Sequence, residues 1–236
     1  MQDFDSMRPV IKVIIPAFNE ADSIGSVIHD IPPEVDEIIV VSNNSTDATE
    51  ENVLKAGATL LKEPKPGYGH ACLKGMEYLA KQDKKLDIVV FLDGDYSDFP
   101  EELIHIVEPI VNDNVDLVIG ARVKRFRESG SMTFPQRFGN KLATSLMRLF
   151  FGSRFTDLGP FRAIKYDKLL KLDMGDKTYG WTVEMQLKAL RQKLIYAEVP
   201  VHYRNRIGTS KVSGTLKGAT FAGAKILGWI FKYSFK

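Results

Sequence analysis

The strongest constraint on the fold is a regular alternation of short β-branched runs with helical patterns over the first 120 residues. Five runs predict strands, at residues 12–16 (KVIIP), 37–41 (EIIVV), 58–61, 87–92 (DIVVFL) and 116–119. Between them, apolar residues recur at helical spacing, at positions 24, 27, 28 and 31 and again at 103, 106, 107 and 110. Strands that alternate with helices form right-handed crossovers and a mostly parallel sheet. We therefore expect an α/β fold with a Rossmann-like first half.

The alternation weakens after residue 120. Residues 123–135 are polar and charged, which predicts a long mobile loop or lid. Helical patterns return at 136–150 and 181–191, and a strand is expected at 195–202. In the first half, Asp47 and Glu50 are expected to form a capping pair for a helix that ends near Gly57.

No repeat or low-complexity linker divides the chain. We therefore expect one domain over residues 1–214, followed by an amphipathic helix over residues 215–236. Within the domain, the change at residue 120 separates residues 1–120 from residues 121–214.

The charge is divided along the chain. Its 236 residues are 44% hydrophobic and 26% charged, which argues against a disordered, collagenous or fibrous protein. The first 120 residues hold 9 basic and 23 acidic side chains, a formal charge of −14, whereas the remainder holds 23 and 7, a charge of +16. The basic half is suited to an anionic partner: phosphate, nucleic acid or an acidic membrane surface. Mutual attraction of the two halves explains the division equally well.

Several features bear on the compartment. Cys72 is the only cysteine, so an intramolecular disulfide framework is excluded and a reducing compartment is expected. The acidic start lacks the basic and apolar regions of a secretory signal, and no window reaches the roughly 18 to 20 apolar residues of a spanning helix. We expect a cytoplasmic protein.

Polar residues follow the predicted strands at the points where ligands bind in open α/β sheets. The segments are PAFNE (16–20), SNNSTD (42–47), DGD (93–95) and Gly120 to Arg122. Asp93 and Asp95 offer hard oxygen ligands to Mg²⁺ or Mn²⁺, and a diphosphate can supply further oxygens. Asp and Gly are also common turn residues, but the position behind two other polar strand ends favours a site.

Two further loops have the composition of phosphate contacts. KPGYGHACLKG (65–75) could bring backbone N–H groups to a phosphate or sugar, although a plain turn explains it too. RIGTSK (206–211) combines a guanidinium, a glycine, hydroxyl groups and an ammonium, which suits a flexible phosphate clamp or a solvated loop.

These motifs, in this order and spacing, resemble inverting family 2 glycosyltransferases with the GT-A fold: VIIPAFNEADSI, EIIVVSNNSTDAT, KPGYGHACLKG, VVFLDGDYSDFPEEL and VIGAR. In the second half, QRFGNKLA, TDLGPFRAI, GWTVEMQLKAL and RIGTSK are similar to the dolichyl-phosphate mannosyltransferase branch and its bacterial polyprenyl-phosphate relatives. The resemblance implies a nucleotide-sugar donor of the GDP-mannose or UDP-glucose type and a lipid-phosphate acceptor. It also implies that residues 1–120 are the nucleotide-binding half and residues 121–214 the acceptor half.

The resemblance also implies residue roles. Catalytic roles fall on Asp93, Asp95, Arg122 and Glu184, of which the two aspartates would bind Mg²⁺ or Mn²⁺. The nucleotide would contact Pro16, Phe18, Glu20, Val41, Asn43, Asp93, Gly94 and Asp95. Phosphates would contact Arg122, Arg137, Arg206, Ser210 and Lys211. Many relatives carry an Asp-Asp pair where this chain has Ser42 and Asn43, which leaves the donor base open.

The acceptor distinguishes the alternatives. A lipid monophosphate is already ionised near neutral pH, so it needs positioning more than a strong base. A hydroxyl acceptor would need a base, for which the candidates are Asp98, Asp157 and Glu184. A non-catalytic nucleotide-sugar binding scaffold would not need the Asp93 and Asp95 pair. A sugar nucleotidyltransferase would carry a glycine-rich loop after the first strand, where PAFNE stands.

Two partner classes follow from the second half. Nucleic acid would explain its basic charge but not the acidic strand ends, so no nucleic-acid partner is expected. Residues 215–235 mix aromatic residues with lysines, which predicts a helix at the cytoplasmic surface of a membrane. A core helix or a dimer interface is the alternative for this segment, and the oligomeric state stays open.

Overall fold

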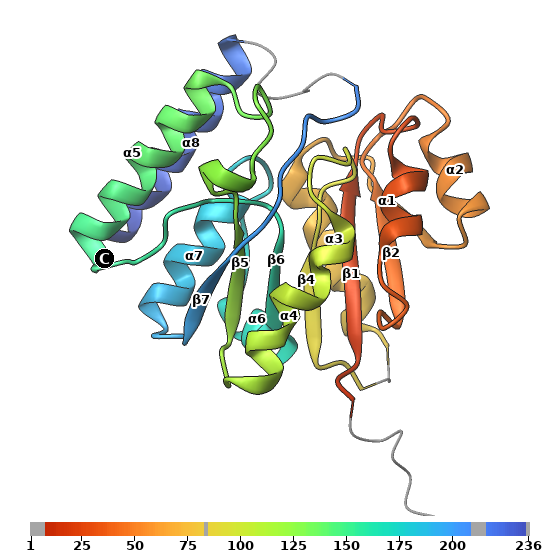
Figure 1. Cartoon of the computed structure of the whole chain (residues 1–236), viewed down its shortest axis with the longest axis horizontal. Coiled ribbons are helices and arrows are strands. Elements are labelled where there is room, and N and C mark those ends of the chain that lie inside the picture. Colours follow the sequence, from red (N-terminus) through yellow and green to blue (C-terminus); the bar gives the residue numbers. More distant parts are fainter. Residues whose placement is uncertain (1–7, 83–84, 209–215, 235–236) are drawn as a thin grey trace, which may run out of the picture.

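The computed structural model describes residues 8–82, 85–208 and 216–234, in which seven strands form one sheet of order β3-β2-β1-β4-β6-β5-β7 (Figure 1). The strands are β1 (Ile11–Ala17), β2 (Glu37–Ser42), β3 (Thr59–Lys62), β4 (Ile88–Phe91), β5 (Leu117–Ala121), β6 (Arg162–Lys165) and β7 (Tyr196–Pro200). Strand β6 runs antiparallel to β4 and β5, and the other neighbours are parallel. The expected α/β fold with a mostly parallel sheet is confirmed.

Helices cover both faces of this sheet (Figure 1). They are α1 (Ile24–Asp30), α2 (Thr49–Lys55), α3 (Tyr68–Ala80), α4 (Leu103–Asn112), α5 (Phe134–Phe151), α6 (Tyr166–Leu172), α7 (Trp181–Arg191) and α8 (Leu216–Ser234). Because successive strand residues point to opposite faces, Val13 and Ile15 pack with α1 and α4 while Ile14 packs with α3 and α7. The sheet is therefore buried on both sides, as parallel sheets are.

Helices α5 and α8 lie side by side at the β7 end of the molecule (Figure 1). Helix α8 also contacts α7, and its Ile230 is fully buried. Trp229 stacks on Tyr233, with ring centroids 5.5 Å apart, and donates its indole N–H to Asp176 over 2.6 Å. One face of the expected amphipathic helix is thus packed onto the protein, and the other carries exposed Phe221 and Phe231.

Sequence patterns located the five strands of the first half, β7, and helices α5 and α7 to within about two residues at most boundaries. They missed β6 and α6. Strand β6 is four residues long and starts with Arg162, whose side chain is completely buried. A short strand with a buried charge lacks the apolar pattern by which strands are recognised.

Two local predictions need correction. Asp47 Oδ1 accepts a hydrogen bond from the N–H of Thr49 at the start of α2, over 3.0 Å, but Glu50 does not complete the expected capping pair, because it accepts from Ser42 Oγ over 2.9 Å. The loop expected over residues 123–135 contains a short 3₁₀ helix, Lys124–Phe126, and ends where α5 begins at Phe134. The Glu128 N–H in this loop donates to the Tyr203 carbonyl over 2.8 Å, and a lid motion stays a prediction.

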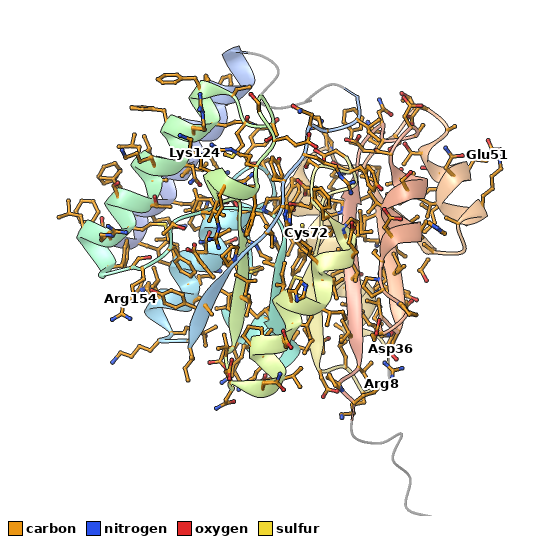
Figure 2. The ribbon with its side chains drawn as sticks, viewed as in Figure 1. Arg8, Asp36, Glu51, Cys72, Lys124 and Arg154 are labelled. Atoms are coloured by element: carbon orange, nitrogen blue, oxygen red, sulfur yellow. The ribbon has the colours of Figure 1, made fainter. Side chains whose placement is uncertain are left out.

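Several ion pairs lie at the protein surface, whereas the side chain of the single cysteine is buried. Figure 2 shows Cys72 inside the molecule and the pair of Arg8 and Asp36 at the lower edge of the sheet. Burial raises the pKa of the Cys72 thiol well above its usual value, so it stays protonated. The carboxyl ends of the parallel strands meet at the opposite edge, where the polar segments of the sequence converge.

Candidate active site

Three polar segments meet at the carboxyl ends of the neighbouring strands β1, β2 and β4. Ser23 Oγ, after β1, donates to the carbonyl of Gly94 over 2.7 Å, which joins the first loop to the Asp93–Asp95 turn. Asn19 and Thr46 join the first loop to the second through a 2.8 Å hydrogen bond from the Thr46 N–H to Asn19 Oδ1. The expected convergence of these strand ends is present in the structure.

Each of these loops contains one non-glycine residue with left-handed backbone: Asn19 (φ 53°), Asn44 (φ 65°) and Tyr96 (φ 61°). Asparagine tolerates this region, whereas a tyrosine there is an outlier. Arg204 holds Tyr96 in place, since its Nε donates to the Tyr96 carbonyl over 2.8 Å and its guanidinium lies 3.5 Å from the ring centroid. Strained backbone of this kind clusters at functional sites.

The Asp93–Asp95 turn presents two carboxylates of different environment. Asp95 is buried, and its Oδ1 accepts hydrogen bonds from the N–H and the hydroxyl of Ser97, over 2.9 and 2.6 Å. Asp93 Oδ1 is buried and has no hydrogen-bond partner among the described residues. Burial, followed by the charge of Asp95, raises the pKa of Asp93. An orphaned buried carboxylate oxygen beside a second carboxylate fits a divalent cation, which would supply the missing charge.

The described residues offer such a cation no larger cluster of ligand side chains. No group of three or more His, Cys, Asp or Glu side chains in those residues is arranged to hold a metal ion. Two carboxylates with hard oxygen atoms suit Mg²⁺ or Mn²⁺ completed by phosphate oxygens and water.

Arg206 links the first loop to the turn. Its Nη2 lies 3.1 Å from Glu20 Oε1 and its Nη1 lies 3.0 Å from Asp95 Oδ2. The backbone of the same segment is fixed, because the N–H groups of Ile207 and Arg204 donate to the carbonyls of Asp95 and Ser97 over 3.0 and 2.9 Å. The structure therefore brings three predicted site residues, Glu20, Asp95 and Arg206, into direct contact.

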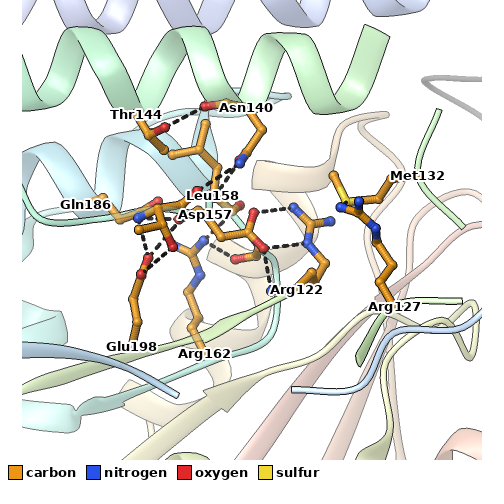
Figure 3. Close-up of polar contacts among 12 residues, drawn as sticks. Arg122, Arg127, Met132, Asn140, Thr144, Asp157, Leu158, Arg162, Gln186 and Glu198 are labelled. Atoms are coloured by element: carbon orange, nitrogen blue, oxygen red, sulfur yellow. Dashed lines mark hydrogen bonds and ion pairs between the residues drawn. The ribbon is translucent and has the colours of Figure 1, made fainter. Parts of the chain in front are cut away.

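Arg122 is already bound to a carboxylate. Its Nε and Nη2 donate to the two oxygens of Asp157 over 2.8 and 2.7 Å, and its backbone N–H donates to the same group (Figure 3). Burial disfavours ionised Asp157, but the charge of Arg122 outweighs it and holds the pKa of Asp157 below its usual value. A contact of Arg122 with phosphate stays a prediction.

Asn43 is used within the protein. Its Nδ2 donates to the carbonyls of Glu63 and Lys65 over 3.0 and 2.7 Å, and its Oδ1 accepts from the N–H of Gly67 over 2.7 Å. This amide fixes the loop after β3, and an aspartate could not supply its two donor bonds. An asparagine at this position therefore has a structural role.

The glycine-rich loop at residues 65–75 does not offer the expected free N–H groups at its start. The N–H groups of Gly69 and His70 donate to the carbonyls of Thr178 and Lys177 over 3.3 and 3.1 Å. A Cβ on Gly69 would lie 2.0 Å from the carbonyl oxygen of Asp176. The glycine is required by this close approach of two backbones.

The remaining predicted residues lie apart from the turn or in the core. Glu184 is buried, accepts hydrogen bonds from the N–H groups of Gly175 and Asp176, and pairs with Lys188 Nζ at 2.9 Å. Its carboxylate thus holds the turn before α7, and its catalytic role stays a prediction. The other positions are as follows: Pro16 and Val41 are buried in β1 and β2, Gly94 is buried in the turn, Phe18 and Arg137 are exposed, and Ser210 and Lys211 lie outside the described residues.

Comparison with known proteins identifies the family. The sequence profile of glycosyl transferase family 2 matches residues 12–172, about two thirds of the chain. The chain belongs to glycosyl transferase family 2. This family 2 chain is 32% identical over 215 residues to an uncharacterized glycosyltransferase of Mycobacterium tuberculosis, which covers 90% of this chain and 94% of that protein. It is 28% identical over 222 residues to the undecaprenyl-phosphate mannosyltransferase of Micrococcus luteus, covering 88% and 89% of the two chains.

Solved structures agree on the fold of this glycosyltransferase. Glucosyl-3-phosphoglycerate synthase of M. tuberculosis, crystallised with Mn²⁺, uridine diphosphate and glucosyl-3-phosphoglycerate, superposes with a TM-score of 0.75 at 23% identity. The superposition covers 96% of this chain and 80% of that one. The predicted GT-A fold is therefore confirmed.

Sequence reasoning did not single out Ser97 and could not assign a partner to Arg204. Arg204 clamps the turn through Tyr96, and Ser97 orients Asp95. Arg204 lies in a polar segment between a predicted strand and RIGTSK. Its partners, the carbonyls of Tyr96 and Asp98, are 108 and 106 positions away in sequence, so the local pattern does not indicate them. The signal available was the pair Arg204 and Asn205 directly before the expected clamp.

Proposed function

We propose that this glycosyltransferase moves a hexosyl group from a nucleotide sugar to a polyprenyl phosphate, with inversion, at the cytoplasmic surface of a membrane. The observation that carries the proposal is the meeting of Asp93 and Asp95 with Arg206 at the carboxyl ends of the parallel strands. Carboxylates for a cation and a guanidinium for phosphate, side by side, suit a substrate that carries a diphosphate.

Asp93 and Asp95 would hold Mg²⁺ or Mn²⁺, and the Mn²⁺ in the crystallised synthase supports this choice. When bound, the ion neutralises charge that develops on the departing nucleoside diphosphate. Ser97 keeps one Asp95 oxygen in place, and Ser23 holds the turn through the Gly94 carbonyl. Arg206 adds a second positive group for the phosphates.

The environment of the candidate bases favours an acceptor that is already ionised. Asp157 is bound to Arg122, and Glu184 to Lys188 and two backbone N–H groups. Asp98 is completely buried, and burial, followed by the charges of Asp93 and Asp95, raises its pKa well above the usual value. None of the three is a solvent-accessible carboxylate, so a phosphate nucleophile fits better than a hydroxyl. The activity in the name of the M. luteus relative supports a polyprenyl phosphate.

Helices α5 and α8 provide a surface that fits a membrane. Exposed Phe134 and Phe138 stack at 6.3 Å on α5, whose far end exposes Leu149, and α8 exposes Phe231. Arg137, Lys141 and Arg148 of α5 are exposed among them. Aromatic and basic side chains together suit an anionic bilayer interface. No described helix is both long and apolar enough to cross a membrane.

The acceptor is tested by a transfer assay with UDP-, GDP- and CDP-sugars and Mn²⁺, in which undecaprenyl phosphate, undecaprenol and 3-phosphoglycerate compete. We expect a product only with undecaprenyl phosphate and at least about a 100-fold loss in Asp95→Asn. Asp113→Asn, an exposed aspartate after α4, is the matched control and should be fully active. Transfer to either other acceptor would replace the proposed one, and donor binding without turnover would leave a scaffold.

The membrane surface is tested by co-sedimentation with phosphatidylglycerol vesicles. Phe138→Ser should lower the partition coefficient by roughly 5- to 30-fold, because part of an inserted aromatic ring is worth about 1–2 kcal/mol. Leu54→Ser on α2, a similarly exposed apolar residue at the other end of the molecule, should bind as the unsubstituted chain does (Figure 1). Equal binding of the two variants would remove α5 from the membrane contact.

A further inference from the structure

Arg206 contacts the Asp95 carboxylate, one of the two groups proposed to hold the cation. Asp95 Oδ1 is taken by Ser97, and Oδ2 is taken by the guanidinium of Arg206 at 3.0 Å. Both oxygens of Asp95 are therefore engaged in the free protein. A carboxylate oxygen has two lone pairs, so a divalent ion can still reach Oδ2, but it would then lie beside the positive guanidinium, which opposes its binding.

The surroundings explain why a positive group is held there. Asp93, Asp95 and the buried Asp98 lie within six residues of sequence, and Glu20 of the first loop contacts the same arginine as Asp95 does. Like charges this close destabilise one another in a poorly solvated site. Arg206 contacts Glu20 and Asp95 at once, so it is a counter-ion for these two carboxylates.

Only the side chain of Arg206 has to move for exchange to occur. The backbone on either side is bonded to the turn, through the Arg204 N–H to Ser97 and the Ile207 N–H to Asp95. The Arg206 side chain itself is about a quarter exposed, at 27%. A guanidinium at a solvent boundary, on a fixed backbone, can change partners without unfolding the segment.

We infer that Arg206 makes divalent-cation binding depend on the donor diphosphate. The inference rests on the proposed function, in which a diphosphate and a cation share this site. A diphosphate supplies anionic oxygens to both cations: it accepts the guanidinium that leaves Asp95, and it completes the coordination of the metal that replaces it. Each ligand then favours the other, and thermodynamic linkage makes the effect reciprocal.

Removing the charge of Arg206 should therefore change the affinity of the protein for Mn²⁺. Coupling between two sites commonly amounts to a 5- to 150-fold change in affinity. We therefore expect Arg206→Gln to bind Mn²⁺, without nucleotide, roughly 5- to 150-fold more tightly than the unsubstituted chain. UDP or GDP, whichever of the two binds, should then improve Mn²⁺ affinity less in the variant than in the parent.

The experiment is a Mn²⁺ titration followed by electron paramagnetic resonance of the free ion, on the whole chain, with no nucleotide, with UDP and with GDP. The variants are Arg206→Gln, Arg206→Gln with Asp95→Asn, and Arg148→Gln, which removes an exposed arginine of α5. Arg206→Lys retains a charge and should stay close to the parent. Circular dichroism and thermal melting verify that every variant is folded.

Tighter Mn²⁺ binding in Arg206→Gln that is lost on adding Asp95→Asn, with Arg148→Gln unchanged, supports the inference. Equal or weaker Mn²⁺ binding in folded Arg206→Gln, still abolished by Asp95→Asn, overturns it while the metal site of the proposed function stands. If no variant binds Mn²⁺ at the Asp95 site, with or without UDP or GDP, the metal assignment fails and this inference fails with it.

Discussion

Replacing Asn43 by aspartate tests whether its amide, rather than a nucleotide, explains the residue at this position. The change keeps the size of the side chain and the oxygen that accepts from Gly67. It removes the two donor bonds, so a carboxylate oxygen faces the carbonyls of Glu63 and Lys65, now 3.0 and 2.7 Å from the amide nitrogen. The loop after β3 should lose its attachment to β2.

The expected loss follows from those two bonds. Each contributes about 1 kcal/mol net, and a carbonyl left without a donor adds about 1 kcal/mol or more. We therefore expect the free energy of unfolding of Asn43→Asp to fall by about 2–4 kcal/mol at pH 8. For a chain of this size that lowers Tm by roughly 4–16 °C.

The loss should shrink in acid. Two facing carbonyl oxygens disfavour the charged carboxylate, so the new carboxyl has a raised pKa in the folded state. A raised pKa stabilises the folded variant below the pKa of the unfolded chain, near 4, and the stabilisation is lost as pH rises. At pH 4 the protonated group can also donate one hydrogen bond.

Urea unfolding at pH 8 and pH 4 measures both effects against the unsubstituted chain at each pH. Asn44→Asp is the matched control, because Asn44 is exposed and its left-handed backbone (φ 65°) suits aspartate as well as asparagine. It should change stability by less than about 0.5 kcal/mol. The reasoning is refuted if the two variants are equally stable at pH 8, or if the loss in Asn43→Asp does not decrease in acid.

Three further predictions test other parts of the structure. Gly69→Ala should destabilise the fold or displace the loop, because its Cβ would lie 2.0 Å from a backbone oxygen. Gly25→Ala in α1 has open space around its Cβ and should stabilise the protein by about 0.5–1 kcal/mol. A higher melting temperature for Gly69→Ala than for Gly25→Ala would contradict this packing. Asp157→Asn should cost about 3–5 kcal/mol in urea unfolding because Arg122 is left buried without its carboxylate, and a loss below about 1 kcal/mol would show that another group takes over. Burial opposes the ionised form of Glu37, but hydrogen bonds to the carboxylate outweigh burial and lower the pKa of Glu37. The stability that Glu37 adds relative to Glu37→Gln should therefore be present above about pH 4.5 and disappear as pH falls below that value. A stability difference that stays constant from pH 7 to 3 would exclude this contribution.

Periodicity was sufficient where a segment is buried on a regular face. The runs that became β1, β2 and β4 are apolar on both faces of a covered sheet, and α4 repeats its apolar residues at helical spacing. The polar segments after these strands could be assigned to one edge because parallel strands end together. Glu20 and Asp95 could therefore be assigned to one edge of the sheet from the sequence.

Contacts over long sequence separation could not be read in the same way. Arg206 meets Glu20 across 186 positions, and nothing local in RIGTSK indicates which carboxylate it pairs with. Arg122 has the composition of a phosphate ligand, but its partner Asp157 is 35 positions away in a loop without periodicity. The role of Asn43 follows only from its hydrogen bonds to the loop at residues 63–67, which the sequence does not show. In each case the missing information was a partner, not a residue type.

The position of β6 has a consequence for how the chain is made. In the sheet, β6 stands between β4 and β5, although residues 162–165 follow both of them in sequence. A nascent chain that ends before residue 162 therefore has β5 without its β6 neighbour and presents the open, apolar edge of β4 to the surroundings. Gene fragments cut near residue 120 should accordingly aggregate, and split-protein designs should place their break after β6.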